Sequence, residues 1–323
     1  MTTDWRPSAA LKTLQQRAVL LAAMREFFAQ RGVLEVDTPT LMPTTATDIY
    51  IDSYRVDSAA SFLQTSPEFA LKRLLAAGSG SIYQLGKVFR REAPSKRHNH
   101  EFTLCEWYRV GMNLNQLMDE VEALVQTVFS AADSQRTAAI KIERLSYRAL
   151  FETHFAIDPH RVSLDKLAAL AEQSLDIVAA DLSRTDYLQL LLSHCIEPNL
   201  PEACFIFDYP VEQAALARLE SDETGQLVAR RFELFLGGME VANGYFELLD
   251  QAEQRTRFVA DIAERARSGF DEVPIDEALL AALAEGMPEC SGVALGVDRL
   301  VMAALGIDDI ARVIAFPQPR PSA

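Results

Sequence analysis

The 323-residue sequence has no apolar run long enough to cross a membrane and no recognisable secretion signal. The longest apolar stretch near the start, residues 18–24, is far shorter than the roughly 20 residues that a membrane-spanning helix needs. The first residues also lack a basic segment followed by an apolar segment and a cleavage site. We therefore expect a cytoplasmic protein with no membrane partner.

Positive charge and cysteine are both scarce. The 31 basic and 46 acidic residues give a formal net charge of −15, which argues against broad nucleic-acid binding, so we do not expect tRNA binding. Residues 87–97 are a local exception, because their cluster of basic side chains can attract a polyanionic ligand. The cysteines show no CxxC spacing, which favours buried free thiols in a reducing compartment over disulfides or a metal site: Cys105, Cys195, Cys204 and Cys290.

The glycine-rich loops that cradle phosphates in many nucleotide-binding proteins are missing. Residues 80–86 have the wrong spacing for a Walker loop, and Lys87 is followed by valine. No GxGxxG follows a predicted strand, and there is no G-x-S-x-G. A nucleotide would therefore have to be held by arginines and a sheet surface.

The hydrophobic pattern predicts a single α+β domain over residues 1–323, with antiparallel strands and a helical insertion at about residues 115–186. Strands do not alternate regularly with helices, so a doubly wound parallel sheet is not expected. The sequence Ser66-Pro67-Glu68 is typical of a helix start. We predict helices over 11–30 and 66–78, strands over 81–91, 102–110, 203–209 and 231–247, and a strand running into a helix over 292–306.

The most informative segment is the predicted hairpin of residues 88–107. Side chains alternate across a strand, so Arg90 and Glu92 share one face while Arg91 takes the other. On the return strand, Phe102, Glu106 and Tyr108 share a face as well. A surface of guanidinium, carboxylate, ring and phenol is poorly suited to a core. It is well suited to gripping a phosphate, stacking a base and orienting an amine.

Five segments resemble, in family order, the motifs of class II aminoacyl-tRNA synthetases, and most of all the lysyl-tRNA synthetase catalytic domain. They are RGVLEVDTP at 31–39, PE and LKRL at 67–74, FRRE and RHNHEF with Glu106 at 89–106, RFELF, GGME and NGY at 231–245, and GVALGVDR at 292–299. One short motif would be weak evidence, whereas five in order over nearly the whole chain are strong.

Three departures narrow the resemblance. The first motif begins at Arg31, so we expect no anticodon-binding domain; Ala294 replaces a glycine; and Trp107 replaces an aliphatic residue. The first departure is the organisation of the elongation factor P–(R)-β-lysine ligases. The resemblance then implies a class II synthetase-like antiparallel sheet flanked by helices.

The same resemblance implies a function. It implies an ATP-dependent ligase that activates (R)-β-lysine as an adenylate and transfers it to a lysine side chain of elongation factor P. It also implies ATP as co-substrate, Mg²⁺ and a homodimer.

Roles for single residues follow by resemblance, aided by their chemistry. Catalysis would use Arg90 and Arg299, and Mg²⁺ would be bound by Glu233 and Glu240. The predicted ATP-binding residues are Arg90, Arg91, Glu92, His98, Asn99, Phe102, Glu240, Val241, Gly296 and Arg299. The predicted amino-acid-binding residues are Ser66, Pro67, Glu68, Glu106, Tyr108, Asn243, Tyr245, Glu247 and Ala294. Gly237 and Gly238 could bend or bulge their strand to bring the two metal-binding acids together.

Plainer explanations compete with these roles. Arg90 could form a surface salt bridge with Glu92, Phe102 could be a core aromatic, and single acids could be solvated. Two other functions also remain open. One is a synthetase-like enzyme that charges tRNA. The other is a non-catalytic paralogue that senses an amino acid, which would be expected to lose phosphate-binding or metal-binding groups.

Overall fold

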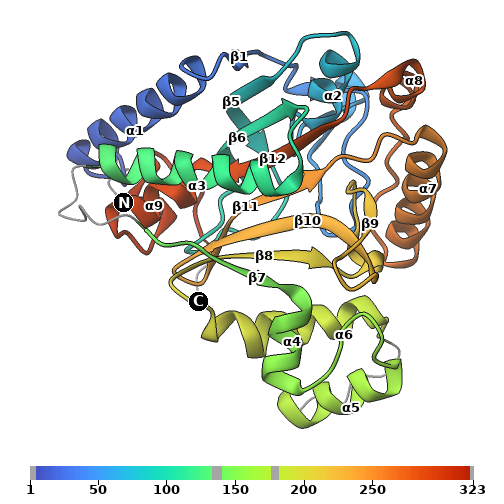
Figure 1. Cartoon of the computed structure of the whole chain (residues 1–323). Helices are drawn as coiled ribbons and strands as arrows, with labels where there is room; N and C mark the ends of the chain where they lie inside the picture. The colour runs from blue at the N-terminus through green and yellow to red at the C-terminus, as the bar shows by residue number, and fades with distance from the viewer. Residues whose placement is uncertain (1–4, 133–139, 176–181, 321–323) are drawn as a thin grey trace. The chain divides into compact units, whose positions relative to one another are not determined.

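The computed structural model describes residues 5–132, 140–175 and 182–320 (Figure 1). The chain forms two compact units: unit 1 comprises residues 1–139 and 249–323, and unit 2 comprises residues 140–248. The prediction of one domain over the whole chain stays a prediction. Each unit contains a mixed sheet flanked by helices, so the predicted α+β class is confirmed.

The sheet of unit 1 has the order β1-β5-β6-β12. Strand β1 runs parallel to β5, whereas β5, β6 and β12 are antiparallel neighbours. A second, three-stranded sheet has the order β2-β4-β3. The bounds are β1 (Leu34–Glu35), β2 (Leu41–Met42), β3 (Arg55–Val56), β4 (Ser61–Leu63), β5 (Ile82–Phe89), β6 (Glu101–Val110) and β12 (Cys290–Gly296), with a 3₁₀ turn at Asp57–Ala59.

Helices cover one face of the unit 1 sheet. Helix α3 contacts β12, and α9 contacts β6 (Figure 1). The Phe28 ring of α1 stacks on Tyr83 at 4.3 Å and meets the edge of Trp107 at 5.2 Å. Tyr83 and Trp107 are cross-strand partners, so these helices lie on the face opposite Glu106.

Local sequence explains where these helices begin and end. Asn113 and Gln116 form a reciprocal capping box at the start of α3, and Gly306 ends α9 in a left-handed conformation with φ 64°. The helices of unit 1 are α1 (Leu11–Ala29), α2 (Glu68–Ala76), α3 (Leu114–Ala131), α7 (Gln251–Arg267), α8 (Glu277–Gly286) and α9 (Val297–Leu305), with a 3₁₀ turn at Ile310–Arg312.

Unit 2 has a sheet of order β11-β10-β8-β7, with β9 pairing beside β10. Strands β7 and β8 are parallel and the other pairs are antiparallel. The bounds are β7 (Glu143–Ser146), β8 (Ala203–Tyr209), β9 (Leu219–Ser221), β10 (Leu227–Leu236) and β11 (Met239–Phe246).

Three helices, drawn in yellow-green shades in Figure 1, pack on the unit 2 sheet. Their shared core joins Tyr147, Phe151 and Leu188 to Ile206 and Phe235 from the strands. The bounds are α4 (Tyr147–Phe155), α5 (Leu164–Leu175) and α6 (Arg184–Leu191), with a π turn at Leu192–Ile196 and 3₁₀ turns at Glu197–Asn199 and Val211–Gln213.

Several predicted elements differ from the structure. The strand predicted over 231–247 is a hairpin, because Gly237 (φ 58°) and Gly238 (φ 65°) form a tight turn between β10 and β11. Within the segment predicted as a helical insertion, α3 lies in unit 1, and β7 adds a strand to unit 2. Part of that segment, residues 133–139 and 176–181, lies outside the described residues. Helices α7 and α8 were not predicted.

The prediction of free thiols is confirmed, although Cys195 is only partly buried. The structure contains free thiols at all four positions, three of them buried. In the described part of the chain, no helix combines the length and apolar character that crossing a bilayer would require.

Candidate active site

One face of the unit 1 sheet carries several of the predicted amino-acid-binding and ATP-binding residues. Glu106 of β6 lies between Gln84 of β5 and Ala294 of β12 in register. Two residues along β6, Tyr108 pairs with Gly292 on the same face. Because α1, α3 and α9 occupy the other face, this face is where a ligand can be bound.

Glu106 is the centre of a buried polar cluster. Its side chain is 2% exposed, and its two carboxylate oxygens accept hydrogen bonds from Ser66 Oγ (2.6 Å) and Tyr108 OH (2.7 Å). Ser66 also accepts a hydrogen bond from the backbone N–H of Glu68 at 3.0 Å, while Pro67 is the N-cap residue of α2. The start of α2 therefore places Ser66 against the Glu106 carboxylate, with Pro67 and Glu68 directly after it.

Burial raises the pKa of Glu106 to about 8. The nearby Glu68 carboxylate also raises this pKa, whereas the hydrogen bonds from Ser66 and Tyr108 and the charge of Lys72 lower it. A buried acid of this kind becomes more stable in its ionised form when an ammonium group binds beside it. The cluster is therefore suited to an amine ligand.

Lys72 is a member of this cluster to which the sequence analysis gave no role. Its Nζ lies 2.6 Å from Glu68 Oε1, and its side chain is 2% exposed. The spacing of four residues on α2 was the available signal, since such pairs meet on a helix surface. Glu68, which was predicted to bind the amino acid, is therefore already paired with Lys72.

Arg90 and Phe102 lie on the same ligand-binding side of the hairpin. The Arg90 guanidinium carbon is 5.2 Å from the centre of the Phe102 ring, and its Nε donates to the Thr65 carbonyl at 3.4 Å. Within the described residues, Arg90 forms no ion pair, so the salt bridge with Glu92 considered above is not made. Phe102 is only half-buried, which argues against a core aromatic.

His98 contacts Arg299 and lies near Glu92. Arg299 Nη2 lies 2.7 Å from His98 Nε2, and His98 Nε2 lies 3.8 Å from Glu92. Because arginine only donates, His98 Nε2 must accept, which leaves the Nδ1 proton to bond Ser95 Oγ at 2.8 Å. Arg299 also donates to the Arg97 carbonyl at 3.3 Å. The structure thus brings the predicted motif residues at the hairpin loop and at the start of α9 together.

Two predicted ATP-binding residues have partners within the protein. Arg91 Nε lies 2.5 Å from Asp52 Oδ2. Asn99 is buried, donates to the Glu101 carbonyl and accepts the backbone N–H of Gln318 at 2.8 Å. Both residues bind neighbouring segments of the chain, and their contact with ATP stays a prediction.

Gly296 is the N-cap residue of α9, opposite Leu104. Asp298, in the first turn of α9, has one carboxylate oxygen 2.6 Å from Arg17 and accepts the Thr103 N–H at 2.7 Å. The sequence analysis gave Asp298 no role. Its contacts fix the helix turn that carries Arg299.

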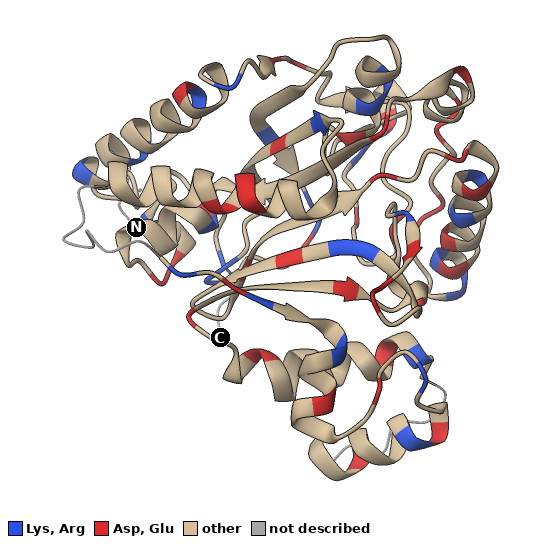
Figure 2. Cartoon of the chain, viewed as in Figure 1, with Lys and Arg blue, Asp and Glu red and all other residues tan. Residues whose placement is uncertain are grey.

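Unit 2 carries the remaining predicted residues on its β10–β11 hairpin and directly after it. Arg231 pairs with Tyr245, and Glu233 with Asn243, across β10 and β11. Arg231 Nη2 lies 2.5 Å from Glu233 Oε1, and Asn243 Nδ2 donates to the same oxygen at 3.4 Å. Strand β10 carries charges of both signs (Figure 2).

Burial raises the pKa of Glu233 to about 7; Arg231 opposes this shift and Glu240 adds to it. Leu234 of β10 pairs with Ala242 of β11, whereas the next residue, Phe235, pairs with Glu240. The buried Val241 is therefore the extra residue of a β-bulge, and Glu240 lies directly beside it. Glu247 is buried beyond the end of β11, in a bridge with Ala217. The turn at Gly237 and Gly238, together with this bulge, sets the spacing of the two acids.

Within the described ranges, no three His, Cys, Asp or Glu side chains form a metal site of their own. The donor chemistry of Glu233 and Glu240 nevertheless fits Mg²⁺, which prefers oxygen ligands and usually takes only one or two carboxylates beside water and phosphate. A desolvated carboxylate with a raised pKa and an acidic neighbour favours a bound cation.

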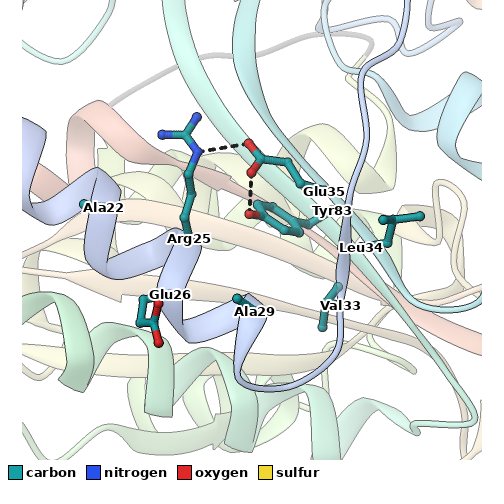
Figure 3. Close-up of a pocket in the computed structure, with 8 residues that line it drawn as sticks. All are labelled: Ala22, Arg25, Glu26, Ala29, Val33, Leu34, Glu35 and Tyr83. Carbon is teal, nitrogen blue, oxygen red and sulfur yellow. Dashed lines mark hydrogen bonds and ion pairs between the residues drawn. The ribbon is translucent and has the colours of Figure 1, made fainter.

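A separate pocket of about 420 Å³ lies at α1 and β1, on the helix-covered side of unit 1 (Figure 3). There Glu35 joins Arg25 Nε at 3.0 Å and accepts the Tyr83 hydroxyl at 2.8 Å. Burial raises the pKa of Tyr83 above its ordinary value. None of the predicted site residues lines this pocket.

Comparison with known proteins shows the family of the chain. The family model of class II tRNA synthetases (D, K and N) matches residues 2–320. The elongation factor P–(R)-β-lysine ligase of Vibrio cholerae is 45% identical over 330 residues, which cover 98% of this chain and 99% of that protein. The ligase of the same name from Yersinia enterocolitica is 44% identical over 334 residues, covering 99% of each chain. That of Proteus mirabilis is 45% identical over 327 residues, covering 97% of each. The chain is an ATP-dependent ligase that belongs to the class II tRNA synthetase family, among the elongation factor P–(R)-β-lysine ligases.

Proposed function

We propose that the chain activates (R)-β-lysine with ATP and transfers the β-lysyl group to a lysine side chain of elongation factor P in the cytoplasm. The observation that carries this proposal is the buried Glu106 cluster, which is suited to an amine and lies on the same sheet face as Phe102. The names of the relatives supply the substrate and the acceptor.

In the first half-reaction, a carboxylate oxygen of the amino acid would attack the α-phosphorus of ATP, and pyrophosphate would leave. Negative charge accumulates on the α-phosphate as this bond forms. Arg90 is suited to stabilise it, because its guanidinium has no competing carboxylate in the described chain and can fork to both reacting groups. Arg299 would bind the outer phosphates.

In the second half-reaction, the uncharged amine of the acceptor lysine would attack the carbonyl carbon of the adenylate. An amide bond would form, the C–O bond to phosphate would break, and AMP would leave, with one proton released from the amine. Glu233 and Glu240 would hold Mg²⁺, which neutralises phosphate charge when bound.

Three features support the amino-acid specificity. Glu106 supplies the negative charge for an ammonium, and Tyr108 and Ser66 fix its carboxylate. Ala294 is the cross-strand partner of Glu106, so its methyl group narrows the space beside the carboxylate. The position of this methyl group makes Ala294 the residue that we expect to select among lysine isomers.

We also propose a homodimer that uses α1 and β1. Val19 and Leu34 are 55% and 56% exposed there, and the open pocket of Figure 3 lies between these elements. Burying such apolar side chains against a second copy would be favourable. Sedimentation of the wild type and of Leu34→Asp would test this, and an unchanged mass for the variant would refute it.

Two other functions are less well supported. A non-catalytic sensor would not need the catalytic arginines or the acids for Mg²⁺, and all of these are present. A tRNA-charging enzyme fits the net charge of −15 poorly.

The decisive experiment has two readouts. ATP–pyrophosphate exchange should depend on (R)-β-lysine and be lost in Arg90→Gln; no exchange with any lysine isomer would refute the ligase. Incubation with ATP, β-lysine and elongation factor P should then increase the mass of the factor by one β-lysyl group. An unchanged factor mass alongside charged tRNA would instead establish the tRNA-charging function.

A further inference from the structure

Asp52 binds Arg91, the residue that directly follows the proposed catalytic Arg90, in two ways. Its carboxylate lies 2.5 Å from Arg91 Nε, and its carbonyl accepts the Arg91 backbone N–H at 2.9 Å. A second acid, Asp271, lies 3.7 Å from Arg91 Nη2. Backbone and side chain of Arg91 are therefore both attached to one residue, which leaves the adjoining Arg90 backbone little freedom.

Asp52 belongs to a segment that has no regular secondary structure and is held by α7. Arg265 of α7 donates from Nη1 to the carbonyls of Asp48 (2.7 Å) and Ile51 (3.0 Å), and its Nη2 lies 3.6 Å from Asp52. Only 1% of the Arg265 surface is exposed. One helical turn earlier, Asp261 accepts the hydroxyl of Thr47 at 2.9 Å.

Arginines are rarely buried unless their N–H groups are hydrogen-bonded, so the contacts of Arg265 with residues 48–52 are a structural feature of the fold. Its remaining Nε donates to the Asp271 carbonyl at 3.3 Å. The same guanidinium thus joins residues 48–52 to the segment that follows α7.

The side chain of Arg90 itself has few restraints. Nε donates to the Thr65 carbonyl at the long distance of 3.4 Å, and the ring of Phe102 supplies the other contact. The direction of its guanidinium therefore depends on where the backbone at positions 90 and 91 is held.

We propose that Asp52 and Arg265 are positioning residues, which align the catalytic Arg90 by holding residues 48–52 against Arg91. This inference rests on the proposed function, and it gives Arg91 a role that does not require contact with ATP. The proposal concerns alignment for the reacting phosphate and leaves the amine pocket at Glu106 unaffected.

The test is a double-mutant cycle on ATP–pyrophosphate exchange. Asp52→Ala should lower kcat by about 10- to 100-fold, since small misplacements of a catalytic group cost rates of this order. The KM for the amino acid should stay within about threefold, because the substitution removes no contact that binds the amino acid equally in the ground state and the transition state. Both variants keep the backbone carbonyl contact with Arg91. Asp52→Asn also keeps one side-chain acceptor, so it should recover part of the rate that Asp52→Ala loses.

The second arm combines Asp52→Ala with Arg90→Lys. If Asp52 acts through Arg90, the combined variant will be impaired less than the product of the two single effects. Multiplicative effects would overturn the proposal. If Asp52→Ala fails to fold, the same cycle is run with Asp52→Asn.

Arg255→Gln is the matched control. Arg255 lies on the same helix as Arg265 and forms an exposed ion pair with Glu277, one of the charged pairs that line α7 (Figure 2). It should leave kcat unchanged; an equal loss of kcat in this control would overturn the proposal. Absence of exchange in the wild type would refute the proposed function itself, which is a distinguishable result.

Discussion

The affinity of the protein for its amino-acid substrate should depend on pH through Glu106. The groups that surround this carboxyl are Ser66 and Tyr108, which donate hydrogen bonds, and the Glu68–Lys72 pair on α2. With a pKa raised to about 8, Glu106 is about one-tenth ionised at pH 7. A substrate ammonium pairs only with the ionised form, so the apparent affinity is reduced by the same fraction.

The assay is the KM for (R)-β-lysine in ATP–pyrophosphate exchange at pH 6 to 8.5, with ATP and Mg²⁺ saturating. Saturation keeps the titration of Glu233, whose pKa is about 7, out of this constant. The wild-type KM should fall about tenfold per pH unit and level off near pH 8. In Glu106→Gln the KM should be high and independent of pH, because the amide cannot ionise.

Glu120→Gln is the matched control. Glu120 is a buried acid with a raised pKa that accepts the Trp107 indole N–H at 3.1 Å, on the face of β6 opposite Glu106. Its replacement should leave the pH profile of KM intact. A wild-type KM that does not change between pH 6 and 8 would refute the reasoning, as would a pH-dependent KM in Glu106→Gln.

The same pKa predicts an effect on stability with a defined sign. The folded protein keeps the Glu106 proton up to about pH 8, whereas the unfolded chain loses it near the ordinary carboxyl value of 4.5. The stabilising contribution is therefore complete below about pH 4.5 and is lost as pH rises through about 8. The unfolding free energy should fall by at most about 1.4 kcal/mol per pH unit in this range, a slope absent from Glu106→Gln.

Three further outcomes are expected. Asp298→Ala should lower the unfolding free energy in denaturant by about 3–5 kcal/mol, because Arg17 is left largely buried without its partner at 2.6 Å; a loss below about 1 kcal/mol would contradict this. Lys72→Met should lower the melting temperature, because Glu68 is left without its cation at 2.6 Å; an unchanged melting temperature would count against the pair. Ala294→Gly should shift exchange towards α-lysine, and an unchanged isomer ratio would count against its place in the pocket.

The sequence predicted the local elements of the site well, because each has a strong local signal. The strand character of the sequence predicted β5, β6 and β8, and the Gly306 stop predicted the end of α9. The start of α2 was predicted to within two residues, since Ser66 accepts the first helical N–H as expected. These features depend on neighbours in the chain, which a single sequence displays.

Long-range partners could not be predicted in the same way. Asp298 meets Arg17 across most of the chain length, and Arg265 meets residues 48–52 from a helix that was not predicted at all. Helix α7 is rich in charged residues, so its apolar stripe is weak and its pattern resembles a solvated segment. The Gly237–Gly238 pair was assigned to a bent strand because sequence alone does not say whether the chain reverses there.

Arg90 and Arg91 show how the two kinds of evidence differ. The motif resemblance placed both arginines at ATP, whereas strand alternation placed them on opposite faces. In the structure Arg90 lies over Phe102, while Arg91 joins Asp52, as alternation requires. Neighbouring side chains on a strand point to opposite faces, so one can face a ligand while the other contacts the protein. A short motif can therefore contain one residue for the chemistry and another that holds it in place, and the alternation of side chains indicates which is which.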